Sequence, residues 1–146
     1  MAVENWIDEI AKLFEISDGR KGTVKSYRAY EKADFPEAIT VYPCAITYTT
    51  GVKMDYPMDI STDIWNGATE FHLVPGVGKH HYPYIMLYFA KIKAAARANK
   101  NLSGKVALFI LDHENISIQG PAVMTYGSED LHLGLVVRWV VTELEG

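Results

Sequence analysis

The chain has 146 residues, 49% hydrophobic and 22% charged, and its 14 Lys and Arg against 18 Asp and Glu give a formal net charge of -4. A chain of this length and composition can bury a core of its own, which excludes intrinsic disorder and any need for disulfides or a structural metal. The mild acidity argues against a protein whose main work is neutralising nucleic-acid phosphates or lying on an anionic membrane. The single cysteine, Cys44, points to a reducing compartment, and we expect one domain spanning residues 1-146 with no membrane span.

The first predicted element is an amphipathic helix over residues 3-16. Apolar side chains recur there three and four positions apart, and charged residues lie between them. The Ser17-Asp18-Gly19 step ends this helix, and an exposed turn follows it. The pattern of residues 23-36 leaves open whether that stretch forms a short helix or packs irregularly.

A long hairpin is predicted next. Residues 38-49 are rich in β-branched and aromatic side chains, Thr50-Gly51 supplies turn chemistry, and residues 52-60 alternate strictly between apolar and other side chains. Pro57 cannot donate a ladder hydrogen bond, so we expect the second strand to lie at a sheet edge or to project as an arm.

The remaining elements are a strand over 69-74, a helix from Pro83 to about Leu102, and four strands over 106-111, 116-119, 122-126 and 131-144. The expected apolar face of the helix consists of Ile85, Tyr88, Phe89, Ile92, Ala95 and Ala96. This order predicts an α+β fold: a mostly antiparallel mixed sheet with two main helices on one face and an extended β-hairpin arm.

Three histidines, His72, His80 and His81, raise the question of a metal site. Adjacent residues of an extended loop point in opposite directions, so His80 and His81 are poorly placed to bind one ion together. We expect no metal, no cofactor and no catalytic residue, and we interpret these histidines as part of a solvated loop. The alternative is a small enzyme that uses one of them with an aspartate from residues 55-63.

Other polar groups have simpler interpretations. Asp55, Asp59 and Asp63 are spaced along what we expect to be a solvated strand face, which discourages edge-to-edge aggregation. Cys44 lies in an apolar strand pattern, where free cysteine behaves as a small hydrophobe. The basic residues between Lys91 and Lys100 complement the negative end of the second helix and are a weak indication of nucleic-acid contact.

Aromatic and methionine side chains in the arm are the strongest candidates for an interaction surface. Such side chains are enriched where one protein surface is buried by another. The alternative is that they pack on the sheet of the same chain, and the pattern does not decide between the two. The candidate interaction residues are Met54, Tyr56, Met58, Ile60 and Trp65.

The chain resembles the tail terminator (tail completion) proteins of long-tailed bacteriophages. The likeness rests on four segments: the helix Trp6 to Ile16, the hairpin start FPEAITVYPCAITYTTG, the helix YPYIMLYFAKIKAAARANKNL and the closing IQGPAVMTYGSEDLHLGLVVRWVVTE. In the closing segment a Gly-Pro pair, a Tyr-Gly turn and a Leu-x-x-Gly before a long apolar strand resemble the C-terminal meander of that family.

The resemblance implies a non-enzymatic virion protein of the tail or neck, assembled in the host cytoplasm. Six copies would form a ring on the finished tail tube, end its polymerisation and offer the opposite face to a head-completion protein. DNA would pass through such a ring without sequence-specific recognition. Another head-tail joining subunit, an adaptor or head-closure protein, is the alternative within the same class.

Overall fold

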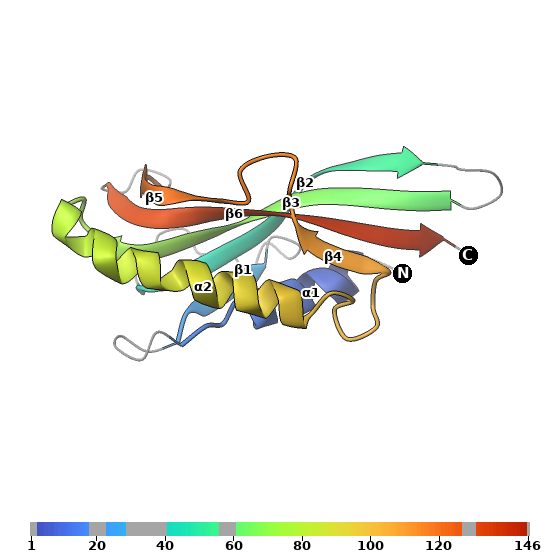
Figure 1. The fold of residues 1–146 in the computed structure, drawn as a ribbon, viewed down its shortest axis with the longest axis horizontal. Coiled ribbons are helices and arrows are strands. Elements are labelled where there is room, and N and C mark those ends of the chain that lie inside the picture. The colour runs from blue at the N-terminus through green and yellow to red at the C-terminus, as the bar shows by residue number, and fades with distance from the viewer. Residues whose placement is uncertain (1–2, 18–22, 29–40, 56–60, 127–130, 146) are drawn as a thin grey trace.

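The computed structural model describes residues 3-17, 23-28, 41-55, 61-126 and 131-145. Its elements in chain order are helix α1 (Val3–Leu13), strands β1 (Lys25–Arg28), β2 (Cys44–Asp55) and β3 (Ser61–Pro75), the 3-10 helix η2 (Lys79–His81), helix α2 (Tyr82–Ala98), and strands β4 (Leu108–Leu111), β5 (Ile118–Met124) and β6 (His132–Glu145). Figure 1 shows one twisted sheet with both helices beneath it, which confirms the predicted α+β fold.

The sheet has the order β1-β2-β3-β6-β4. β5 also pairs with β6, at residues 132-137, whereas β4 pairs with residues 139-142. All of its pairs are antiparallel except β1 with β2, which are parallel. The mixed, mostly antiparallel sheet was therefore predicted correctly. Strand β1, within the stretch that the sequence left open, pairs only with the first four residues of β2, Cys44 to Thr47.

The predicted hairpin exists, but its turn was misplaced. β2 runs through Thr50 and Gly51 as far as Asp55, and its partner is β3, which starts at Ser61. The alternating residues 52-55 thus belong to the first strand of the hairpin, and residues 56-60, including Pro57, lie outside the described residues. The strand predicted over 69-74 is the second half of β3.

Other boundaries also differ from the sequence prediction. α1 ends at Leu13 and not at residue 16. α2 ends at Ala98, earlier than the predicted Leu102, because the chain turns between Asn99 and Lys105. The strands predicted over 116-119 and 122-126 are one strand, β5, whose register against β6 shifts between Gln119 and Ala122. The strand predicted over 106-111 starts at Leu108.

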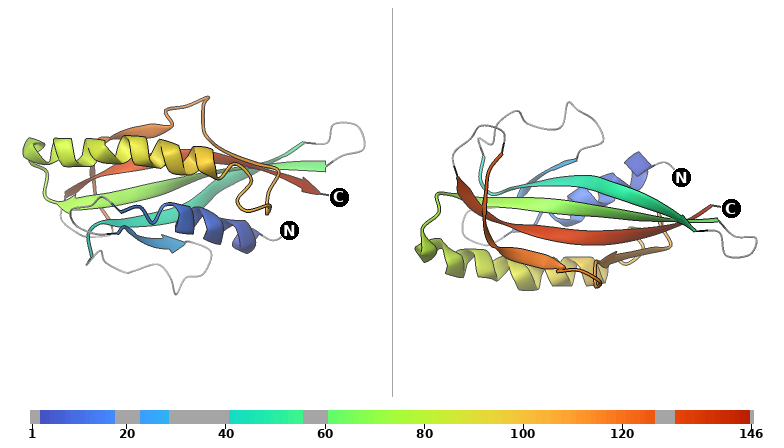
Figure 2. Two further views of the ribbon diagram at one scale, coloured as in Figure 1. Left: turned by 60° about the horizontal axis from the view of Figure 1, so that its bottom comes forward. Right: turned by 90° about the horizontal axis from the view of Figure 1, so that it is seen from above.

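The core lies between the helices and one face of the sheet. Both helices bury a single apolar stripe there, as amphipathic helices do, and Figure 2 shows them on the same side of the strands. β6 contributes alternate residues to this face because successive side chains of a strand point to opposite sides. The buried apolar side chains of β6 are Leu133, Leu135, Val137, Trp139 and Val141.

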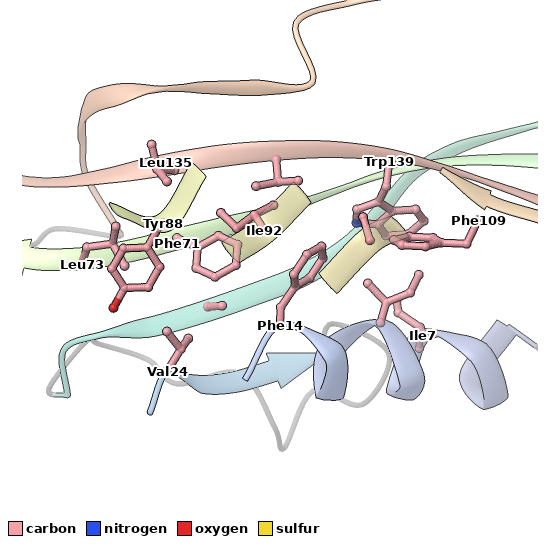
Figure 3. Close-up of a cluster of buried hydrophobic side chains, with 14 of the residues drawn as sticks. Ile7, Phe14, Val24, Phe71, Leu73, Tyr88, Ile92, Phe109, Leu135 and Trp139 are labelled. Atoms are coloured by element: carbon pink, nitrogen blue, oxygen red, sulfur yellow. The ribbon is translucent and has the colours of Figure 1, made fainter. Parts of the chain in front are cut away.

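Aromatic rings fill the middle of this core. Figure 3 shows Ile7 of α1 and Phe14, the residue after α1, pointing toward the sheet, opposite Trp139 and Phe71. Phe14 meets Phe71 edge to face, with ring centroids 5.5 Å apart. Phe109 of β4 lies 6.2 Å from the ring of Trp139, which closes the end of the core near the short strand β4.

Candidate functional site

The distal half of the β2–β3 hairpin comprises residues 51-55 and 61-66, and its outer end extends past β4 (Figure 1). We call this segment the hairpin arm. Val52 and Met54 lie on the side of the sheet that faces the helices, in register with Trp65 and Asp63. Their side chains are 41% and 60% exposed, respectively. The arm therefore exposes apolar side chains on the helix side of the sheet, where neither helix covers them.

Five residues were predicted to form the interaction surface, and the structure describes two of them. Met54 is the most exposed large apolar side chain of the arm. Trp65 is partly buried and packs against the core, with its ring 5.7 Å from that of Trp6. Tyr56, Met58 and Ile60 lie outside the described residues.

A buried carboxylate ties the arm to α1. Glu143 accepts a hydrogen bond from Nε1 of Trp6 at 2.9 Å and another from Nε1 of Trp65 at 3.2 Å. Its neighbour in register, Asp63, is also buried at 9% exposure. The prediction that Asp63 lies on a solvated strand face was wrong, because Asp63 alternates in phase with Trp65 and Phe71 of β3, which face the helices.

Gly67 permits a close approach at the same place. A Cβ atom there would lie 2.2 Å from Cη2 of Trp139, so no residue with a side chain fits without displacing that ring. Trp139 is fully buried and donates from Nε1 to Oγ1 of Thr69 at 3.2 Å. The arm is thus held at its base by close packing as well as by hydrogen bonds.

The histidines occupy two different places. His72, expected in a solvated loop, is fully buried in β3 on the face away from the helices, where it is in register with Cys44. His80 and His81 lie in η2 with their ring centroids 4.0 Å apart. Among the described residues no three His, Cys, Asp or Glu side chains are grouped so that they could hold a metal ion.

His72 belongs to a polar network that the sequence analysis missed. Its Nδ1 lies 2.5 Å from Nε2 of His132, and its Nε2 lies 3.3 Å from Oε1 of Glu70 in an alignment that falls short of a hydrogen bond. The hydroxyl of Tyr48 donates to Oε2 of the same carboxylate at 2.5 Å. The four residues come from β2, β3 and β6, and no spacing in the sequence marks them as neighbours.

Electrostatics fixes the charge of Glu70 in this network. The contact with His72 lowers the pKa of the Glu70 carboxyl, and the Tyr48 hydroxyl lowers it further, against a smaller opposing effect of burial. Burial raises the pKa of the Tyr48 phenol, and the hydrogen bond to Glu70 adds to that rise. Tyr48 therefore stays a donor and Glu70 an acceptor at neutral pH.

The two histidines of the network are buried. His72 and His132 are 0% and 1% exposed, so neither imidazole is accessible to a substrate in this conformation. Cys44 is buried beside them in an apolar strand, as expected for a free cysteine that acts as a small hydrophobe. The enzyme alternative pairs a histidine with an aspartate of residues 55-63. In the structure, the polar side chains that contact His72 are those of Glu70 and His132.

Comparison with models of known protein families and with curated proteins gives no match to this chain. Within the described part of the chain, no helix is both long and apolar enough to cross a membrane. The functional assignment must therefore come from the surfaces of the fold.

Proposed function

We propose that the chain is a structural subunit of a bacteriophage tail, a tail terminator that closes into a homohexameric ring on the finished tube. In this role it ends tube polymerisation and offers its other face to a head-completion protein in the virion neck. The proposal requires no catalysis and no cofactor. The functional site of such a subunit consists of contact surfaces on the α+β domain.

The observation that carries this proposal is the hairpin arm. Glu143 holds the arm through Trp65, and the arm exposes the apolar side chains of Val52 and Met54. A fixed hairpin with exposed apolar side chains is suited to contact a neighbouring subunit. An arm that binds a different surface of the next copy makes a heterologous contact, and heterologous contacts that close by rotation give rings. The mixed sheet with both helices on one face is the α+β fold expected from the sequence patterns.

Electron microscopy tests the proposal. We expect six-fold rings at the head-proximal end of tails that carry the chain, and tails of uncontrolled length when it is missing. A ring found at the distal tip, or tails of normal length without the chain, would reject the terminator role. A ring located between the terminator position and the portal would instead support another head-tail joining subunit.

A further inference from the structure

A groove of about 310 Å³ lies between the C-terminal half of α2 and the strands β4 and β5. Figure 2 shows both strands beside this half of the helix. The apolar residues that line the groove are Phe109, Ile110, Leu111 and Ile118. Phe109 is fully buried, whereas the other three are partly exposed. The groove therefore offers apolar surface to a partner.

Three basic side chains line the same groove. Lys93, Arg97 and Lys100 are exposed and make no ion pair within the described part of the chain. The dipole of α2 places about half a negative charge at this end of the helix, so most of the positive charge is uncompensated. No Asp or Glu occurs from Phe71 to Leu111, so neither α2 nor β4 carries an acidic side chain. The groove is thus both apolar and positively charged.

The exposed surface continues along α2 beyond the groove. Met86, Ala90, Lys93 and Arg97 are spaced four, three and four positions apart, which places them along one line of the helix. Met86 is 50% exposed, and Ala90 is exposed as well. At 1.5 Å per residue this line is roughly 16 Å long, or about three helical turns. A surface of this length matches a short segment of polypeptide better than a small molecule.

We infer that the α2–β4–β5 groove binds an amphipathic helical segment of another protein. Its apolar side chains would enter the groove, and its acidic side chains would meet Lys93, Arg97 and Lys100. An added β-strand is a poorer fit, because the backbone N–H of Phe109 is already bonded to the carbonyl of Lys100 at 2.5 Å. The lining of the groove contains no residue of the hairpin arm, so this partner does not depend on the terminator role proposed above.

Two other ligands would match only part of this surface. Nucleic-acid phosphates would contact the basic side chains and leave the apolar lining uncovered. A second copy of the chain would need a face that is both acidic and apolar. The exposed acidic side chains among the described residues, Glu15 and Glu114, lie in separate places, just after α1 and between β4 and β5. Charge complementarity therefore favours a different, acidic protein.

A designed peptide tests this contact. The probe is a fluorescein-labelled helical peptide of about 15 residues, with leucines along one face and glutamates beside them. We expect it to bind the purified chain in fluorescence anisotropy measurements at low salt. One control peptide has serine in place of every leucine, and the other has lysine in place of every glutamate. Each control lacks half of the contact and should bind at least about tenfold more weakly. Absence of binding by the probe, or equal binding of either control, would overturn the inference.

Charge reversal locates the contact on the protein. Arg97→Glu should weaken binding of the probe about tenfold at low salt, because it places a like charge against the glutamates. Lys79→Glu makes the same change in net charge at an exposed position outside the groove, and should change the affinity by less than about twofold. Circular dichroism checks that both variants are folded. Equal effects of the two variants would reject the groove.

Methyl NMR gives a measurement that does not depend on a charge change. The probe should shift the methyl resonance of Ile118, which lines the groove, and leave that of Ile64 in the hairpin arm unchanged. Equal shifts of the two resonances would overturn the inference. Tighter binding of a short DNA duplex, with the same shift at Ile118, would make the groove a nucleic-acid site instead. Self-association in sedimentation experiments that Arg97→Glu abolishes would make the occupant a second copy of the chain, which would also overturn the inference.

Discussion

Glu143 accepts a hydrogen bond from Nε1 of Trp6, 137 positions away in the sequence, and so ties the first helix to the last strand. Trp6 is fully buried and Glu143 is 6% exposed, so neither group can exchange this bond for water. The second donor to the same carboxylate, Trp65, comes from the hairpin arm. One buried side chain therefore holds the N-terminus, the C-terminus and the arm together.

The first prediction concerns this carboxylate. Glu143→Leu should lower the free energy of unfolding by about 2 to 4 kcal/mol, because it leaves the buried indole N–H of Trp6 without an acceptor. Glu143→Gln keeps one acceptor oxygen and turns an amide NH2 toward the second indole N–H, so it should cost less than Glu143→Leu, about 1 to 2 kcal/mol. Urea unfolding monitored by tryptophan fluorescence measures both, and the exposed Glu114→Gln is the control. Equal losses for Leu and Gln would contradict the hydrogen-bonding role.

The second prediction concerns Gly67. Gly67→Ala should cost about 3 kcal/mol, because the added Cβ meets the ring of Trp139, which is buried and bonded to Thr69 and cannot move aside. Gly51→Ala is the matched control in the same hairpin, since nothing lies within 4 Å of a Cβ at that position. It should change stability by less than about 0.5 kcal/mol. Thermal and denaturant unfolding measure the loss of stability in each variant. Equal losses for Gly67→Ala and Gly51→Ala would contradict the close packing of Gly67 on Trp139.

The third prediction concerns the pH dependence of the Tyr48–Glu70 pair. A carboxyl whose pKa is lower in the folded than in the unfolded state adds stability above its ordinary pKa of 4.5, and loses that contribution as pH falls through the folded value. The stability of the native protein relative to Glu70→Gln should therefore shrink below about pH 4.5. Tyr48→Phe removes one donor and should raise the pKa of Glu70, as read from its carboxyl resonance by NMR. A Glu70 resonance that titrates at or above 4.5 in the native protein would contradict this.

The main elements could be predicted because their signals are local. α1, α2 and β6 each carry a continuous periodic pattern, and both helices have one apolar stripe that a single sheet face can bury. The hairpin turn was misplaced because Thr50-Gly51 has turn chemistry while lying in an extended strand beside a bulge. The bulge inserts one residue, so Thr49 and Val52 face the same side and the alternation changes phase.

The candidate sites were predicted less completely, because they depend on long-range contacts. His72 and His132 are 60 positions apart and come together because β3 and β6 pair in the sheet, with a register shift just after His72. The groove between α2, β4 and β5, whose lining includes Lys93, Arg97 and Lys100, likewise needs these three elements to come together, although the run of basic residues in α2 was visible in the sequence. Trp65 was grouped with Met54 by composition alone, and only the fold separates its packed indole from the exposed thioether.

The fourth prediction separates the exposed side chain of the arm from the one that anchors it. Met54 is 60% exposed, so Met54→Asp should change the free energy of unfolding by less than about 0.5 kcal/mol. Trp65→Ala removes the ring contact with Trp6 and the hydrogen bond to Glu143, and should cost about 2 to 3 kcal/mol.

Met54→Asp, which should hardly change stability, should nevertheless impair ring assembly. If the arm is buried by a neighbour, Met54→Asp places an unpaired carboxylate in an apolar contact at a cost of several kcal/mol, enough to abolish rings on tails. Circular dichroism and thermal melting are to be set beside electron microscopy of tails carrying each variant. A Met54→Asp protein that unfolds would place this residue in the core of its own chain. A folded Met54→Asp protein that still caps tails would remove the arm from the ring contact.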